Sequence, residues 1–255
     1  MFPNVSVTLL QLNGLCYMKH KIRFTSKKDL SNICFFIKGI ALSRSCLDYL
    51  KRGHKTDGFY KIRNSYTNKI ITVYCDMTSE PGSAWTLVMS FALMNKNMKQ
   101  LTKKTFRQNA PVNKYSPNWM SYRMSWLQMN YLKSLSTHWR TTCSYPFSKV
   151  DYRDYVRAKF SDFDIMTFLG HGDCKKVEFI NIRGFSCADC TSKWWQILNQ
   201  DSPHIDSRAT GCQLDASAGS VDSEDNFGLY LSTNKKFRCT NNDFSTTNWW
   251  FGGYI

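Results

Sequence analysis

No stretch of this sequence is long and apolar enough to cross a lipid bilayer. The most apolar run, Ile33–Leu42, is short and is interrupted by Lys38, whereas a spanning helix needs about 20 consecutive apolar residues. A clear secretory signal is also missing, because Met1–Tyr17 has an apolar middle without a basic start. A start at Met18 would place a basic KHKIR segment before the Ile33–Leu42 run, in the order that a signal has. We therefore predict a chain without a membrane span, in which residues 1–44 form an N-terminal extension that includes a candidate signal region.

The sequence also lacks the short motifs that accompany common catalytic sites. It has no glycine-rich phosphate loop, no G-x-S-x-G nucleophile motif and no H-E-x-x-H metal motif. Its 5 histidines are scattered along the chain. Catalytic sets assemble in space, so scattering alone does not exclude one. On the missing motifs we predict that the protein is not an enzyme.

Acidic residues are absent from the middle of the chain. Residues 81–150 contain 10 Lys or Arg and no Asp or Glu, whereas residues 151–255 contain 11 basic and 14 acidic residues. The net charge of the whole chain is +15. A basic region of this kind attracts phosphate, sulfated glycans or anionic membrane headgroups. The alternative is a solvated basic face without a specific partner.

The first half of the chain contains clear signals of local structure. Ser45 can cap a helix, with Asp48 as the capping-box acid, and Gly53 can end that helix. The stretches Phe59–Arg63 and Lys69–Asp76 are rich in aromatic and β-branched residues, which is typical of strands. The pattern therefore predicts a short helix followed by a β-hairpin.

The second half alternates between strand patterns and loops. Asp151–Ile165 and Lys176–Ile182 alternate apolar and charged residues and are predicted strands. Met120–Leu135 has the spacing of a partly buried helix or of a strand followed by a helix. After Pro203 the chain is rich in Gly, Ser, Asp and Asn, which predicts long loops. We predict an α+β domain over residues 45–255, with a mixed, mainly antiparallel sheet, short helices and long disulfide-pinned loops.

The cysteine content indicates the compartment. Ten cysteines are many for a cytosolic chain and ordinary for an extracellular one. An even number permits complete pairing. We therefore predict a secreted, extracellular protein; the alternative for Cys46 and Cys75 is that both are free buried thiols.

Several motifs follow one another in the order that they have in a known family. The chain reads SCLDYLKRG over residues 45–53 and CDMTSEPGSAWTLV over residues 75–88. Shorter matches follow at Asn118-Trp119, His138-Trp139-Arg140, Gly172-Asp173-Cys174, Thr210-Gly211-Cys212, and Cys239 with Asp243-Phe244-Ser245 and Trp249 or Trp250. In these motifs the sequence resembles the fibrinogen C-terminal-like (fibrinogen-related) domains, and it is most similar to their intelectin-like branch.

The resemblance implies two disulfides, Cys46–Cys75 and Cys174–Cys212. The first would close a loop of about 30 residues, which the chain-entropy model values at roughly 3–4 kcal/mol of stability. The pairing of the remaining cysteines is left open: Cys16, Cys34, Cys143, Cys187, Cys190 and Cys239.

The resemblance also implies a secreted, calcium-dependent lectin of innate immunity or cell adhesion, with glycans or glycoproteins on cell or microbial surfaces as partners. Trp249, Trp250 and Tyr254 fall near the family's aromatic ligand box, and Asp243 begins the matched DFS segment. We predict these four as ligand-binding residues. Core packing is the alternative for the Trp pair, and whether the chain forms a homo-oligomer is open.

Calcium is the cofactor that the resemblance implies, but the family's ligand positions are not matched. The family has an Asn and then a His soon after the cysteine matched by Cys212, where this chain has Gln213, Leu214, Asp215 and Ala216. Calcium takes six to eight oxygen ligands, and one other loop is rich in them. We predict this loop as the metal site: Asp222, Glu224, Asp225 and Asn226. Its alternative is a solvated acidic loop.

A competing hypothesis starts from the spacing H-x2-C-x12-C-x2-C at His171, Cys174, Cys187 and Cys190. This spacing is acceptable for a tetrahedral zinc site. Together with the basic middle of the chain, it favours a basic intracellular zinc protein that binds nucleic acid, although we rank nucleic acid well below glycans as a partner. A third alternative is an extracellular adhesion module without a sugar site.

Overall fold

The computed structural model describes residues 9–12, 15–18 and 42–255. The chain divides into two compact units, Met1–Leu42 and Ser43–Ile255. In the first unit, strand β1 (Leu9–Leu12) pairs antiparallel with β2 (Leu15–Met18). The rest of the description concerns the second unit.

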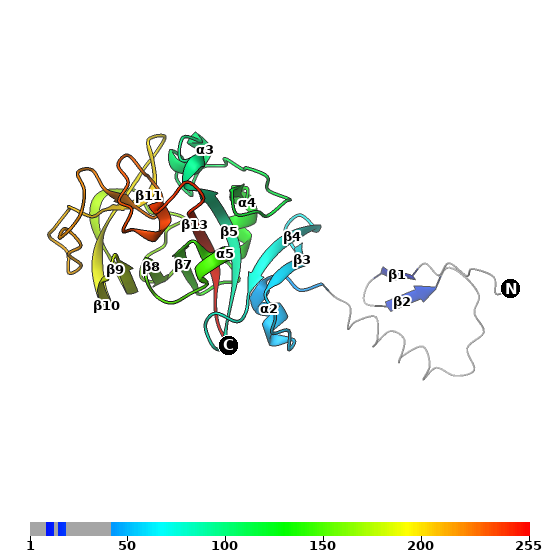
Figure 1. Ribbon diagram of the computed structural model, residues 1–255. Helices are drawn as coiled ribbons and strands as arrows, with labels where there is room; N and C mark the ends of the chain where they lie inside the picture. Colours follow the sequence, from blue (N-terminus) through cyan, green and yellow to red (C-terminus); the bar gives the residue numbers. More distant parts are fainter. Residues whose placement is uncertain (1–8, 13–14, 19–41) are drawn as a thin grey trace. The chain divides into compact units, whose positions relative to one another are not determined.

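The second unit is built on an 11-stranded sheet in which all neighbouring strands are antiparallel. The order across the sheet is β12-β11-β10-β9-β8-β7-β13-β5-β4-β3, and β6 pairs with β5. Figure 1 shows the sheet curving through the molecule, with β3 and β4 at one end and β9 and β10 toward the other. The strands are β3 (Gly58–Asn64), β4 (Lys69–Asp76), β5 (Ser83–Ala92), β6 (Ser121–Arg123), β7 (His138–Cys143), β8 (Tyr155–Lys159), β9 (Gly170–Ile182), β10 (Phe185–Ile197), β11 (Asp201–Asp206), β12 (Asp225–Asn226) and β13 (Thr246–Tyr254).

The helices are short and lie in the connections between strands. They are α2 (Cys46–Lys51), η1 (Leu93–Asn95), α3 (Lys99–Thr102), α4 (Trp126–Lys133), α5 (Tyr145–Ser148) and η2 (Arg238–Thr240). Within the described ranges, no helix combines the length and apolarity that a membrane crossing requires. A mainly antiparallel sheet with short helices and disulfides is confirmed.

The helix and hairpin at the start of the unit form where their local signals predict them. The Ser45 hydroxyl accepts a hydrogen bond from the Asp48 amide at 3.2 Å and caps α2. At the hairpin turn, the Asn64 side-chain oxygen accepts from the Tyr66 amide at 2.9 Å. A disulfide from Cys46 to Cys75 then fastens α2 to β4.

The last strand, β13, lies in the middle of the sheet, between β5 and β7 (red in Figure 1). Its residues are buried on both faces up to Gly253. Gly252 is required there, because a Cβ atom at this position would lie 2.0 Å from the carbonyl oxygen of Ala84. The strand thus brings Trp249 and Trp250 into the core, where Trp139 and Trp194 are also fully buried.

Four disulfides join the elements, and two of them are the bridges that the resemblance implies. These two are Cys46–Cys75 and Cys174–Cys212, and the others are Cys143–Cys239 and Cys187–Cys190. Cys34 lies outside the described residues, as does the side chain of Cys16.

The zinc hypothesis is therefore wrong for this structure. Cys174 is bonded to Cys212, and Cys187 is bonded to Cys190. The hypothesis needed these sulfurs as thiolates beside His171, and a disulfide sulfur does not supply one.

Candidate ligand-binding site

The predicted aromatic box does not assemble in the structure. Trp249 and Trp250 have no exposed surface, so neither can contact a ligand, and the expectation for this pair is corrected to core packing. Each indole nitrogen already has a partner: the nitrogen of Trp249 donates to the carbonyl of Phe227, and that of Trp250 donates to the hydroxyl of Thr142. The resemblance placed this pair near the family's aromatic box by its position in the sequence, and position alone does not distinguish a buried tryptophan from one that lines a site.

The other two predicted ligand residues lie at opposite ends of β13. Asp243 is exposed and precedes the strand, whereas Tyr254 is its last residue. Nine residues of strand span roughly 26–30 Å, so the two side chains cannot hold one small ligand. Tyr254 instead accepts a hydrogen bond from Arg157 at 2.5 Å and stays 38% exposed.

Arginine side chains of the protein already pair with carboxylates of the oxygen-rich loop at residues 222–226. Glu224 is buried, and its carboxylate forms an ion pair with Arg183, with Nε of Arg183 2.8 Å from Oε1 of Glu224. Arg183 also donates to the backbone carbonyls of Ala216 and Ala218. Asp222 points outward and pairs with Arg208 at 2.6 Å. The carboxylates of this loop therefore neutralise arginines.

The remaining members of the loop are buried in polar contacts. Burial raises the pKa of Asp225 to about 7, and its carboxylate lies 3.6 Å from the ring of His204. Burial likewise lowers the pKa of His204. Both shifts favour the uncharged forms. The side-chain oxygen of Asn226 accepts from the hydroxyl of Ser207.

This arrangement does not fit a calcium ion. A calcium site needs several oxygen ligands that converge without a competing cation, and the Arg183 guanidinium already sits against Glu224. In the part of the chain that the structure describes, no group of three or more His, Cys, Asp or Glu side chains is placed to hold a metal. The loop is accordingly held in place by Arg183, and its residues do not fit a calcium ion.

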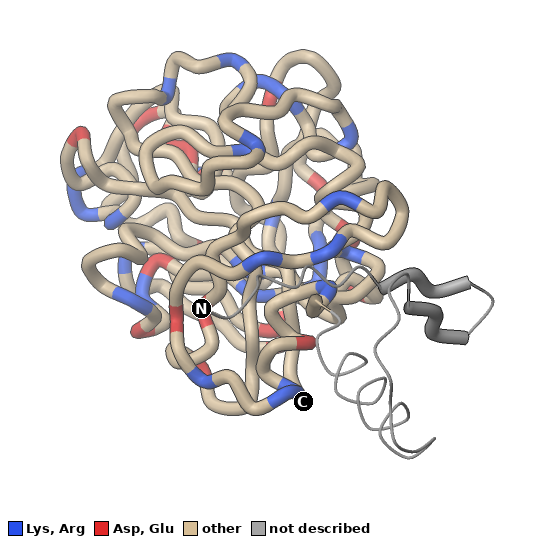
Figure 2. The backbone as a smooth tube through the Cα atoms, turned by 90° about the vertical axis from the view of Figure 1, so that its right-hand side faces the viewer, with Lys and Arg blue, Asp and Glu red and all other residues tan. Residues whose placement is uncertain are grey.

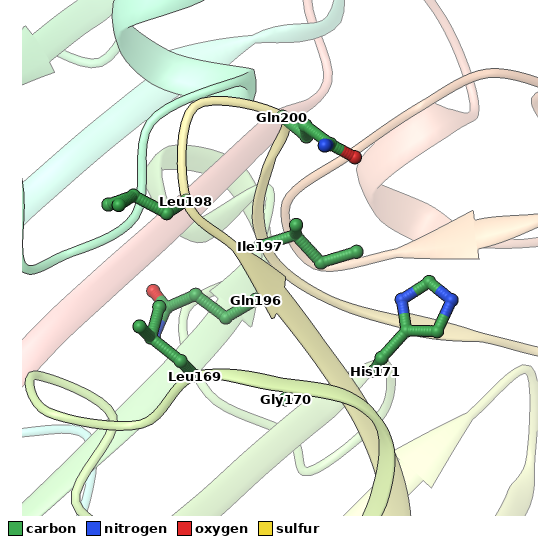
Figure 3. Close-up of a pocket in the computed structure, with 7 residues that line it drawn as sticks. All are labelled: Leu169, Gly170, His171, Gln196, Ile197, Leu198 and Gln200. Carbon is green, nitrogen blue, oxygen red and sulfur yellow. The ribbon is translucent and has the colours of Figure 1, made fainter.

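A surface depression lies where β9 begins and β10 ends. It has a volume of about 590 Å³ and a mainly apolar lining. Figure 3 shows the start of β9 lying opposite the end of β10, with the side chains of both around the depression. Two leucines on its rim are unusually open to solvent, Leu169 at 40% and Leu198 at 49%. The lining is completed by Gly170, His171, Gln196, Ile197 and Gln200.

The floor of this depression is fixed by Gln196. Its side chain is fully buried and donates to the carbonyls of Ile165 and Phe168, while its oxygen accepts from the amide of Phe106. The depression is thus preformed by a rigid polar anchor beneath exposed apolar side chains. The sequence offered one signal that was missed, an apolar Leu198 placed directly before the Asn199-Gln200 turn.

A basic loop borders the depression. The side-chain oxygen of Asn199 accepts from Lys104 at 2.8 Å and from Gln108 at 2.6 Å, which joins the end of β10 to this loop. The loop is organised by the buried Arg123, whose guanidinium donates to four backbone carbonyls, those of Gln100, Lys104, Thr105 and Gln108. Exposed cations lie along the same segment at Lys99, Lys103 and Arg107. Figure 2 marks the Lys and Arg positions, which are spread over this unit.

The comparisons with known proteins identify the fold. The sequence matches the family described as fibrinogen beta and gamma chains, C-terminal globular domain, over residues 42–192, which is more than half of the 255 residues. The chain belongs to this family. The comparison with curated proteins gave no match.

The fibrinogen match does not reach the site residues that the sequence predicted. It includes the whole helix-and-hairpin start, β9 and the first part of β10. It ends before Trp249, Tyr254 and the acidic loop at residues 222–226. It does not distinguish the intelectin-like branch. The fibrinogen-like domain, with its four disulfides, fits an extracellular recognition module.

Proposed function

We propose that this chain is a secreted recognition protein that binds glycans on cell or microbial surfaces and catalyses no reaction. The observation that carries the proposal is the preformed depression between β9 and β10. Its exposed Leu169 and Leu198 offer contact to the apolar face of a sugar ring or to an acyl substituent. His171 and Gln200 supply hydrogen-bonding groups to the same space.

The family and the oxidised cysteines support the extracellular part of this proposal. Four disulfides are the pattern of a protein that works in an oxidising compartment. The proposal moves the binding site away from the C-terminal residues that the sequence indicated. It also makes binding independent of calcium, since Arg183 neutralises Glu224 in the acidic loop.

A glycan array with the full chain tests this function. We expect binding to a subset of glycans that is unchanged by a chelator. Leu198→Gln should weaken this binding about tenfold, because it removes one of the two exposed apolar contacts of the depression. Leu231→Gln is the matched control, because Leu231 is a 63% exposed leucine that does not line the depression.

Three results would contradict the proposal. Equal glycan binding by Leu198→Gln and Leu231→Gln would show that the depression is not the binding site. Loss of binding with the chelator would restore a calcium-dependent mechanism. Undiminished binding to enzymatically deglycosylated cell surfaces would favour the adhesion module without a sugar site.

A further inference from the structure

A second cavity lies between the β3–β4 turn, the loop at residues 112–118 and the start of α4. Its volume is about 180 Å³. Its lining combines polar, basic, aromatic and aliphatic side chains: Asn64, Thr67, Lys69, Ile71, Lys114, Tyr115, Ser125, Leu127 and Gln128. It shares no residue with the depression at β9 and β10.

The charges in this cavity are positive and uncompensated. Lys69 and Lys114 both line it, and neither forms an ion pair with any residue of the described part. No Asp or Glu belongs to the lining. Lys114 is half-buried and Lys69 is exposed, so an anion that enters the cavity from solvent can reach both ammonium groups.

The neutral polar groups offer donors more than acceptors. The side-chain oxygen of Asn64 is used by the amides of Tyr66 and Thr67, at 2.9 and 3.2 Å. Its side-chain nitrogen has no hydrogen-bond acceptor among residues 42–255. The side-chain oxygen of Gln128 is likewise used, by the amide and hydroxyl of Ser125. The donors left to face a ligand are the Asn64 side-chain nitrogen and the hydroxyls of Thr67 and Tyr115, next to the two lysine ammonium groups. This set favours an anion.

The cavity wall is built in advance of any ligand. Ser125 and Gln128 form the capping box that begins α4. The Gln128 side-chain nitrogen donates to the carbonyl of Lys114 at 3.4 Å, which joins the loop at residues 112–118 to α4. The ammonium of Lys114 lies 5.1 Å from the ring centroid of Tyr115, and that ring is 54% exposed. An aromatic face beside donors is the arrangement that receives a sugar ring.

We infer that this cavity binds an acidic saccharide, with the sulfate or carboxylate group between Lys69 and Lys114 and the sugar ring against Tyr115. A phospholipid suits it less, because the lining has no continuous apolar channel for acyl chains. Nucleic acid suits it less, because the disulfides place the domain outside the reducing compartments. The inference goes beyond the proposed function, since this site does not need the depression to bind.

Binding of immobilised oligosaccharides to the full chain tests the inference. The probes are a fully sulfated heparin hexasaccharide, the same hexasaccharide after desulfation, which keeps its carboxylates, and a neutral oligosaccharide that lacks both groups. The test variant is Lys69→Gln with Lys114→Gln. The matched control is Lys99→Gln with Lys103→Gln, which removes the same charge from exposed positions outside the cavity.

We expect the test variant to lose at least about tenfold in affinity for the hexasaccharide that binds best, because two charge-assisted hydrogen bonds are removed. The control variant should lose less than about threefold. The sulfated and desulfated probes separate sulfate from carboxylate as the bound group. An unchanged melting temperature shows that the test variant is folded, and Leu198→Gln should leave hexasaccharide binding intact.

The outcome that overturns the inference is an equal loss in both variants, which would mean a diffuse attraction to the +15 chain. Binding of the neutral oligosaccharide as tight as that of the acidic ones would overturn it as well. So would tighter binding of single-stranded DNA or of phosphatidylserine vesicles with the same dependence on Lys69 and Lys114. If Leu198→Gln leaves glycan-array binding unchanged, the proposed function fails but the acidic-saccharide site is still tested by Lys69 and Lys114, because the two sites share no residue.

Discussion

Replacing Arg140 with methionine should destabilise the domain more than any surface substitution. Arg140 lies on β7 with its side chain fully buried, and it pairs with Asp76 and Glu80, which are buried as well. Its guanidinium carbon is 4.5 Å from the ring centroid of Trp85 and 5.2 Å from that of Trp250. Methionine would preserve much of the volume while leaving Asp76 without its cation and Glu80 with Arg157 alone.

The expected loss follows from the burial of all three charges. Removing one member of a buried ion pair costs about 3–5 kcal/mol, because the partner is left charged in an apolar surrounding. For a domain of this size, that corresponds to a fall in melting temperature of roughly 10 °C. The triple variant D76N/E80Q/R140M removes the stranded charges together, so it should recover a large part of the loss. Urea unfolding followed by tryptophan fluorescence measures all three proteins.

The pH dependence provides an independent check. Burial opposes ionisation of Asp76, but Arg140 outweighs it and holds the pKa of that carboxyl below its usual value of 3.8. The wild-type contribution is therefore present above about pH 3.8 and is lost as the pH falls through the lower folded value. In R140M the burial of Asp76 is opposed only by the hydrogen bonds from the Thr78 and Ser79 amides, so the loss of stability relative to wild type should become smaller as the pH falls from about 7 to 5. A loss below about 1 kcal/mol, or a triple variant no more stable than R140M, would refute the reasoning.

Three further outcomes are expected. Replacing the Cys143–Cys239 pair with alanine should cost about 4–5 kcal/mol, against about 2 kcal/mol for the Cys187–Cys190 pair, because the first closes a far longer loop; urea unfolding of both variants in parallel tests this order. Burial raises the pKa of Asp225 to about 7, so folding favours its protonated form. The stability that this form contributes is full below the pKa of the unfolded state and is lost as the pH rises through about 7. Asp225→Asn should therefore flatten the dependence of unfolding free energy on pH between about pH 4 and 8, and should be more stable than wild type at the upper end. Finally, calcium or a chelator should leave the melting temperature of the wild type within about 1 °C, whereas Arg183→Gln should lower it by several degrees because Glu224 stays buried; a calcium-dependent rise in the wild type would contradict this.

The sequence predicts those parts of the fold that depend on neighbours in the chain. Helix α2 begins at the Ser45 cap, and the Asp48 carboxylate accepts from the amide and side chain of Arg44, so neighbours in the chain mark its start. The hairpin of β3 and β4 follows for the same reason. In contrast, Trp250 is buried by pairing with Leu87 and Arg140, which lie more than 100 positions earlier. The sequence pattern of β13 itself does not indicate which distant segments it pairs with.

The same limit explains the predicted metal loop. Its carboxylates have the composition of a cation site, and Glu224 does bind a cation. The cation is Arg183, which lies 41 positions earlier in the chain. Composition alone cannot tell a carboxylate that awaits a metal ion from one that is already paired across the fold. The two cavities were missed for a related reason, since each is lined by segments that become neighbours only on folding.

Arginine and lysine have different roles in this molecule, and the difference bears on its partners. The buried cations are arginines: Arg123 donates to four carbonyls, Arg140 pairs with two carboxylates, and Arg183 holds Glu224. A planar guanidinium satisfies several fixed acceptors at once, which a lysine cannot do. Arg140 and Arg183 pair with carboxylates inside the domain, whereas no Asp or Glu lines the second cavity beside Lys69 and Lys114. An acidic ligand can therefore reach Lys69 and Lys114 from solvent, and added salt should weaken that contact.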